Sequence, residues 1–279
     1  MMRLLFFSTL LACAEAEAEL EPCNGSPILC SRSLAEIAVL TTHNAMSNHE
    51  DGWGAPNQFN PIDQQLKDGV RGLMLDIYDE DGLLMLCHGV CWAGSLELAT
   101  GLGFIAEFLR ENPRELLTLI LENYSEAADL LAAFDSAGLA DQLHLQNPQA
   151  PWPSLQQMID SKRRLVVLTD TGETPSRGIL AVWEHAFDTP YAAQTADDLS
   201  CELGRGAAGN SLFILNNFLT APLPAPELAE TVNFNPFLLD RAKRCGVARD
   251  HLANFVTVDF YNLGDAAAVV DTLNAASAH

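Results

Sequence analysis

The sequence predicts an α/β protein that folds as a single distorted (β/α)8 barrel of the TIM type. Short apolar runs alternate with amphipathic stretches through most of the chain, which is typical of parallel strands joined by crossover helices. About eight such runs occur in 279 residues, and this length suits one barrel. The sequence has neither a glycine fingerprint for dinucleotides nor a phosphate-binding G-x-x-x-x-G-K. An open doubly wound sheet is the second choice.

Eight apolar runs have the length and composition of buried strands. They cover Ile37–Leu40, Gly72–Ile77, Leu83–Cys87, Leu116–Leu121, Leu165–Leu168, Leu180–Trp183, Leu212–Leu215 and Phe255–Phe260. Amphipathic stretches predict helices over Ile62–Asp68, Leu96–Glu111, Glu126–Ala137, Leu155–Ser161, Pro236–Cys245 and Asp265–Ala275. The proline-rich residues 222–226 predict a loop.

The first residues predict export. Arg3 precedes a short apolar run, and small residues in A-x-A spacing follow it, which is the pattern of a secretory signal. We assign residues 1–18 to this signal and residues 19–279 to the barrel. Residues 10–13 also resemble a bacterial lipobox, in which Cys13 would carry the lipid. The protein is therefore expected to be secreted or held in the cell envelope.

Six cysteines remain after Cys13, an even number that suits three disulfides in an exported protein. Proximity in sequence and loop placement favour three pairs, although six cysteines allow fifteen connectivities. The pairs are Cys23 with Cys30, Cys87 with Cys91, and Cys201 with Cys245. Zinc binding is the alternative, but no C-x-x-C pair is present.

The chain is strongly acidic, with a formal net charge of −22 at pH 7. Such a charge repels nucleic-acid phosphates and anionic lipid head groups at long range, although salt weakens the effect. We therefore expect no nucleic-acid partner.

Polar side chains follow several predicted strands at their C-terminal ends, where α/β barrels keep their active sites. LTTHNAMS places His43 and Asn44 after the first run. GVRGLMLDIYDEDG contributes Asp76, LLMLCHGVC contributes His88, and LLTLILENYSE contributes Glu122. Each residue alone is explained by a turn or a solvated loop end. Together, at successive strand ends, they predict one site at the rim of the barrel.

These residue types indicate acid–base chemistry on a phosphate ester. Histidine titrates near neutral pH, so one imidazole can take a proton while a second gives one. Asn44, Asp76 and Glu122 are hard oxygen donors that suit Ca²⁺ or Mg²⁺. The alternative is that the two carboxylates orient the histidines by hydrogen bonds.

These four motifs, in this order and spacing, resemble the X domain of phosphatidylinositol-specific phospholipases C and of their secreted bacterial relatives. Three later stretches fit as well: VWEHAFDTPY at 182–191, SLFILNNFLT at 211–220 and NFVTVDFYNLGD at 254–265. The resemblance covers nearly the whole mature chain. Any single motif is weak, but the first four together are specific.

The resemblance implies a distorted TIM barrel that cleaves a phospholipid or inositol phosphodiester by internal attack of a neighbouring hydroxyl, giving a cyclic phosphate. His43 matches the family's base or phosphate-contacting histidine, and His88 matches the histidine that assists the leaving oxygen. Asn44, Asp76 and Glu122 match the positions that hold Ca²⁺ in the metal-dependent members. The metal-independent bacterial enzymes carry an arginine where Asp76 stands, so this chain resembles the metal-using branch.

Two departures from the family pattern limit these expectations. The calcium-dependent animal enzymes have a glutamate where this chain has Met74, so one metal ligand is missing. They also have lysines that bind inositol phosphates after the strand corresponding to Leu165–Leu168, where this chain has Thr169-Asp170-Thr171. We therefore expect a neutral head group or simple phosphatidylinositol, a weakly bound cation, transient contact with a membrane surface, and a monomer.

Two other functions remain open. A glycerophosphodiesterase or a sphingomyelinase-D-like enzyme shares the barrel and the paired histidines, but these families place Glu-x-Asp where this chain has Met74-Leu75-Asp76. A secreted barrel that has lost catalysis and only binds its ligand is the alternative from another class.

Overall fold

The computed structural model describes residues 21–276. The predicted signal at residues 1–18 and the lipobox with Cys13 lie outside this range. Within it, none of the helices combines the length and the apolar character needed to span a bilayer.

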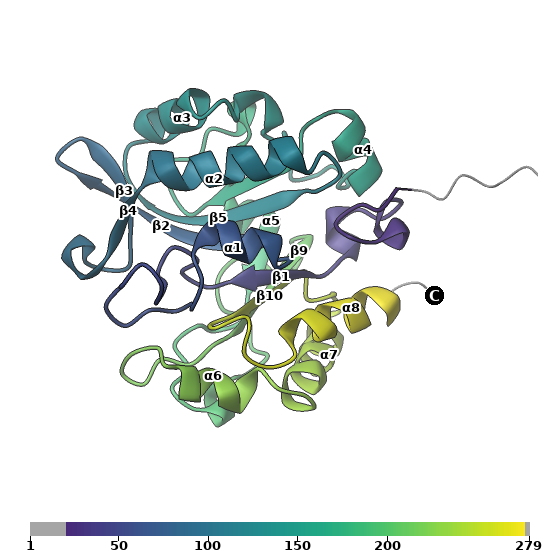
Figure 1. Cartoon of the computed structure of the whole chain (residues 1–279). Helices are drawn as coiled ribbons and strands as arrows, with labels where there is room; N and C mark the ends of the chain where they lie inside the picture. The colour runs from purple at the N-terminus through teal and green to yellow at the C-terminus, as the bar shows by residue number, and fades with distance from the viewer. Residues whose placement is uncertain (1–20, 277–279) are drawn as a thin grey trace, which may run out of the picture.

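Eight parallel strands form one sheet that curls into an incomplete barrel, in the order β7-β6-β5-β2-β1-β10-β9-β8 (Figure 1). They are β1 (Val39–Thr42), β2 (Gly72–Glu80), β5 (Leu117–Tyr124), β6 (Leu165–Thr169), β7 (Ile179–Ala181), β8 (Ala186–Asp188), β9 (Leu212–Asn217) and β10 (Phe255–Val258). The outermost strands β7 and β8 are joined through one helical turn, α5 (Val182–His185), rather than by a ladder. The predicted distorted barrel is confirmed.

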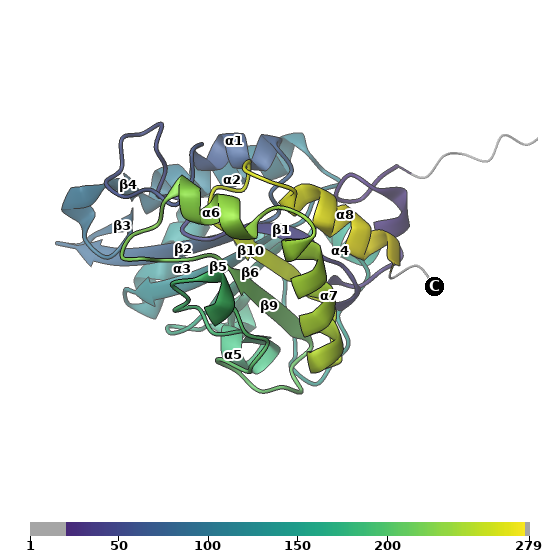
Figure 2. The same cartoon turned by 90° about the horizontal axis from the view of Figure 1, so that it is seen from below.

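Helices cover the outside of the sheet. In Figures 1 and 2, α2 and α3 lie along one side, and α7 and α8 lie along the other. The bounds are α1 (Ile62–Lys67), α2 (Leu98–Glu111), α3 (Ala127–Ser136), α4 (Leu155–Asp160), α6 (Pro226–Val232), α7 (Phe237–Arg249) and α8 (Ala266–Ala276). The predicted loop at residues 222–226 ends where α6 begins, because Pro226 occupies the first turn, where its missing N–H costs nothing.

Two strand predictions need correction. Leu83–Cys87 is a strand, β3, but it pairs antiparallel with β2 and with β4 (Ser95–Glu97), outside the barrel. The predicted strand Leu180–Trp183 merges the end of β7 with α5. The missing barrel strand is β8, whose three buried residues are too few to show a period in the sequence.

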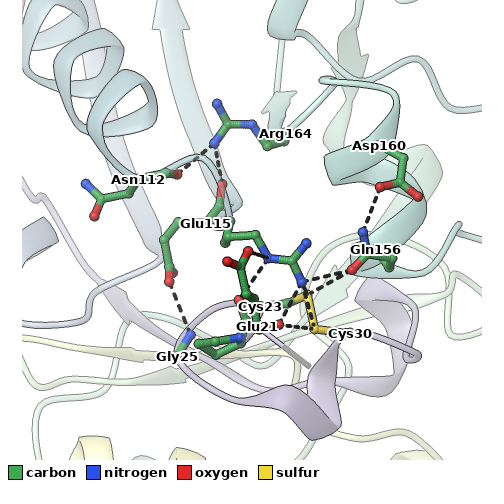
Figure 3. A network of polar contacts seen from close by, with 11 residues as sticks. Glu21, Cys23, Gly25, Cys30, Asn112, Glu115, Gln156, Asp160 and Arg164 are labelled. Carbon is green, nitrogen blue, oxygen red and sulfur yellow. Dashed lines mark hydrogen bonds and ion pairs between the residues drawn. A yellow bond between two sulfur atoms is a disulfide. The ribbon is translucent and has the colours of Figure 1, made fainter. Parts of the chain in front are cut away.

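The three predicted disulfides are confirmed: Cys23 with Cys30, Cys87 with Cys91, and Cys201 with Cys245. The first fastens the N-terminal segment beside α4 (Figure 3). Arg114 donates to Gln156 Oε1 at 2.9 Å and lies 3.1 Å from Cys23 Sγ. The guanidinium thus ties this segment to the barrel.

Candidate active site

The alternation of strand side chains builds the site. Along β2, Leu73 and Leu75 are buried against the surrounding helices, so Met74 and Asp76 point to the inside of the barrel. The same alternation brings His43, Glu122 and Asp170 to the inner rim, just beyond or at the ends of β1, β5 and β6. Below them, Phe255, Ile214 and Leu168 fill the interior. The polar residues therefore form the uppermost layer of a packed barrel.

All five residues predicted from the sequence line one cavity of about 390 Å³ at this rim: His43, Asn44, Asp76, His88 and Glu122. Their roles in chemistry stay predictions. The cavity also takes in residues that the sequence did not single out, namely Tyr78, Tyr124, Trp183, Tyr191, Arg205, Asn216 and Phe218.

His43 is held on two sides. Its Nδ1 lies 2.9 Å from Oδ1 of Asp259, a carboxylate that is only 3% exposed. Its ring stacks on Phe218, with the centroids 3.7 Å apart and the planes 7° apart. Asn57 donates to the same Asp259 oxygen at 3.0 Å. An Nδ1–H donated to Asp259 leaves Nε2 as the acceptor nitrogen of the neutral ring.

Asp259 was not assigned from the sequence, although it lay within a quoted motif. It follows β10 directly, and FVTVD repeats the pattern of an apolar strand ending in a carboxylate that identified Asp76. Parallel pairing of β1 with β10 places the ends of these two strands side by side, because Thr42 is opposite Val258. His43 and Asp259 are the next residues in that register.

His88 reaches the cavity by a different route from the one its strand-end position suggested. Strand β2 extends past the rim, and β3 returns antiparallel with Ile77 opposite Leu86. Two residues further, His88 is back at the level of the rim, on a loop closed by the disulfide between Cys87 and Cys91. Burial, and next the positive charge of His43, lower the pKa of His88. His88 and His43 both line the same cavity.

An acidic wall faces the histidines from β2, β5 and β6. Asp76 is opposite Glu122 in the parallel register, and both line the cavity with Asp170. Burial, followed by the charges of Glu122 and Asp170, raises the pKa of Asp76 well above its usual value. Tyr124 donates its hydroxyl to Glu122 and stacks on Tyr78 with centroids 4.6 Å apart. Keeping the carboxyl group of Asp76 ionised beside two other carboxylates is therefore costly.

The donors that could hold a cation are partly in place. Asp76 is 9% exposed and Asn44 is 3% exposed, and neither side chain has a hydrogen-bond partner within residues 21–276. Carboxylate and amide oxygens that face a cavity and accept no hydrogen bond from the protein suit a hard cation. In the same range no three His, Cys, Asp or Glu side chains converge as a ready-made metal cluster. An ion here would need further oxygens from water and substrate.

A sequence model of the family described as PI-PLC X 1 matches residues 29–274. Among curated proteins, a PI-PLC X domain-containing protein of Arabidopsis thaliana is 28% identical over 264 residues, covering 84% of this chain and 60% of that protein. An uncharacterized secreted protein of Arthroderma benhamiae is 28% identical over 275 residues, covering 88% and 61%. The chain thus spans about three-fifths of these two relatives' length.

A third relative, PI-PLC X domain-containing protein 1 of Arthroderma benhamiae, is 25% identical and is matched over 95% of its length. Among solved structures, a mutant of the phosphatidylinositol-specific phospholipase C of Staphylococcus aureus superposes with a TM-score of 0.58. The two sequences are 15% identical, and the match covers 83% of this chain and 87% of that one. Similarity at this level supports the shared barrel.

Proposed function

The chain belongs to the PI-PLC X domain family, and from this membership we propose that it cleaves a phosphodiester of the phosphatidylinositol type by histidine acid–base catalysis. One observation carries the proposal. His43, held by the buried carboxylate of Asp259, shares one cavity with a second histidine, His88. Two such imidazoles can serve the attacking and the leaving oxygen of one phosphorus.

In the proposed reaction, a hydroxyl of the head group attacks the phosphorus while Nε2 of His43 takes its proton. The bond from phosphorus to the lipid oxygen breaks, and His88 gives a proton to that oxygen. The products are a cyclic phosphate and a free lipid alcohol. Asp259 keeps the Nδ1 proton of His43 in place and stabilises the imidazolium that forms.

His88 must carry a proton to act as the acid. Burial and the charge of a protonated His43 work against this, whereas the negative charges of Asp259 and Glu122 favour the protonated ring. A bound phosphodiester would add a further negative charge beside it. The protonated state of His88 is therefore expected mainly in the substrate complex.

We also propose that Asn44, Asp76 and Glu122 hold a divalent cation, Ca²⁺ or Mg²⁺. When bound, the ion would neutralise charge on the phosphoryl oxygens. With only two carboxylates and an amide from the protein, and Met74 where a further ligand would stand, affinity without substrate should be weak. A dissociation constant of about 10⁻⁴–10⁻³ M is typical of weak extracellular calcium sites.

The proposed setting is an extracellular one, with the enzyme monomeric and in transient contact with a lipid surface. Three disulfides suit an oxidising compartment. The loop that carries His88 is closed by the disulfide between Cys87 and Cys91 and contains Val90, whose exposed fraction is 46%. Trp92 follows this loop directly and is 88% exposed. Residues 82–96 contain no Asp, Glu, Lys or Arg. An uncharged aromatic edge of this kind suits the interface of a zwitterionic bilayer.

Phosphorus NMR of the products tests the proposal. Phosphatidylinositol should yield a cyclic inositol phosphate, and His43→Ala and His88→Ala should each slow turnover by about 10²- to 10⁴-fold. A non-cyclic glycerophosphate, or release of a choline from sphingomyelin, would indicate the related phosphodiesterases instead. No product from any of these diesters, with the ligand still bound, would indicate a binding barrel.

A further inference from the structure

His88 has no side-chain anchor of its own. Its half-buried ring makes no hydrogen bond and no aromatic stacking contact within residues 21–276. His43, by contrast, is held by the carboxylate of Asp259 and by the ring of Phe218. The position of the His88 imidazole in the cavity therefore depends mainly on the backbone that carries it.

This backbone leaves the sheet directly before His88. The β3–β4 ladder ends where Cys87 pairs with Ser95, so the hairpin loop begins at His88. Gly89 follows with a φ of +74°, a conformation that favours glycine, and Val90 donates its N–H to the His88 carbonyl at 2.8 Å. Gly89 and Val90 are exposed. His88 thus lies in a tight turn at the surface, beyond the last pair of the ladder.

The far side of the hairpin loop is fixed by other contacts. The Ala93 carbonyl accepts the Gly54 N–H at 2.6 Å. A Cβ added at Gly94 would lie 2.5 Å from the ring of Trp53, which is itself only 8% exposed. Only glycine lets the chain pass this close to the indole. Residues 91–94 are therefore packed against the loop between β1 and α1.

The disulfide between Cys87 and Cys91 joins these two fixed parts. Cys87 is fully buried at the end of β3, Cys91 begins the packed segment, and their Cα atoms are 4.9 Å apart. Four extended residues could span about 13 Å. The bond therefore excludes most of the conformations that residues 88–90 could otherwise adopt, and His88 lies inside the ring that it closes.

From these contacts we propose that the Cys87–Cys91 disulfide is the positioning element of His88, and that a dithiol which reduces this bond slows the reaction. The inference rests on the proposed function, because it takes His88 as the proton donor. Cys91 is partly exposed whereas Cys87 is fully buried, so the thiolate of the reductant should attack Sγ of Cys91.

The attack forms a mixed disulfide with Cys91 and breaks its bond to Cys87, which leaves as a thiolate and takes a proton from water. The second thiolate of the reagent then displaces Cys91, whose sulfur is protonated in the same way. The protein gains two electrons and two protons, and the dithiol becomes a cyclic disulfide. With the ring open, His88 spends only part of its time in the productive geometry.

The first test uses the double variant Cys87→Ser/Cys91→Ser and a soluble short-chain phosphatidylinositol, so that vesicle binding does not enter. Its kcat should fall about tenfold, less than for loss of the imidazole itself, and KM should stay within about twofold, because a displaced proton donor acts on the transition state. Cys23→Ser/Cys30→Ser is the matched control and should keep the wild-type kcat, because that bridge also closes a short loop and does not line the cavity. Wild-type kcat in Cys87→Ser/Cys91→Ser would overturn the proposal.

A titration of the wild type with dithiothreitol tests the same point without a substitution. Alkylation and peptide mapping report which bridge is open, and kcat should fall with the fraction of chains in which Cys87 and Cys91 are free. His88→Ala should lose no further activity on reduction, since it has no imidazole to displace. A loss that follows another bridge, or an equal fold-loss in His88→Ala, would refute the positioning role.

Nitrogen-15 NMR of the His88 ring is a readout that does not depend on turnover. Opening the bridge should release the ring from burial, so its lowered pKa should rise toward the ordinary value while the His43 signals stay unchanged. If no diester is cleaved but the pKa of His88 rises on reduction, the proposed reaction fails and the positioning role stands. An unchanged pKa of His88 with the bridge open refutes the positioning role whatever the turnover.

Discussion

Replacing Asp259 by asparagine should disable His43 without unfolding the protein. The carboxylate Oδ1 serves two donors, Nδ1 of His43 at 2.9 Å and Nδ2 of Asn57 at 3.0 Å, and its Oδ2 is buried without a partner. An amide in this position either turns its NH₂ toward both donors or leaves that NH₂ buried and unsatisfied. In both cases the negative charge that stabilises the imidazolium is lost.

The expected loss in kcat for Asp259→Asn is about 10²- to 10⁴-fold, the usual contribution of a positioned general base. At about 1.4 kcal/mol per factor of ten, this corresponds to about 3–6 kcal/mol of activation free energy. Asp265→Asn is the control, because Asp265 lies six residues further on the same connection, accepts the Asn235 backbone N–H and does not line the cavity.

Turnover of a phosphatidylinositol diester and nitrogen-15 NMR of the His43 ring are the two assays. The wild type should show a proton on Nδ1; Asp259→Asn should shift it toward Nε2 where the new NH₂ faces the ring, and should lower kcat in either orientation. A variant that remains folded and keeps kcat within about threefold of the wild type would refute the view that Asp259 sets the tautomer.

Three further predictions concern the rim, the acidic wall and a buried histidine, His144. Trp92→Ala should weaken binding to phosphatidylcholine vesicles by about tenfold in a sedimentation assay. Val247→Ala is the control and should not, because Val247 is similarly exposed, at 86%, but lies on α7. Equal losses in the two variants would contradict the proposed orientation. Asp76→Asn should raise the Ca²⁺ concentration needed for half-maximal activity, and full wild-type activity in a metal-free sample verified by elemental analysis would exclude the ion. Burial lowers the pKa of His144, so the unfolded chain binds a proton there first as the pH falls below about 6.5, and the folded state loses stability. The loss of unfolding free energy between pH 7 and pH 5 should therefore be smaller in His144→Gln. Urea titrations at the two pH values measure this difference.

The barrel could be predicted from the sequence because buried parallel strands and amphipathic helices leave periodic patterns. The two strands that were predicted wrongly either lack such a pattern or carry it outside the barrel. Strand β8 has three residues and no visible period, and β3 has the composition of a barrel strand although its partner runs antiparallel. Apolar composition predicted that β3 is a strand, but it gave neither the exposure of Leu83 nor the direction of the strand, which is set by the preceding turn at Asp81 and Gly82, both at positive φ.

The candidate site was predictable where a carboxylate interrupts a recognisable apolar run, as Asp76 and Glu122 do, although β2 and β5 continue past these residues. His88 was placed at the rim for the wrong reason, since it arrives by a returning hairpin rather than at the end of a barrel strand. Arg205 could not be predicted. It lies 17 residues beyond Asp188 in irregular chain, and nothing in the sequence pattern links the two.

The two walls of the cavity place different demands on a phosphodiester. Arg205 is already neutralised by Asp188, so the wall that carries it offers hydrogen bonds but little charge. The opposite wall holds Asp76 and Asp170, whose pKa values are both raised, chiefly by burial. An incoming phosphate adds negative charge beside this wall, and a proton on His88, a proton on one of these carboxyl groups or a cation at Asp76 can balance it. Substrate should therefore raise the affinity of the site for protons and for Ca²⁺, and because coupling between two bound species is reciprocal, each should tighten the substrate by the same factor.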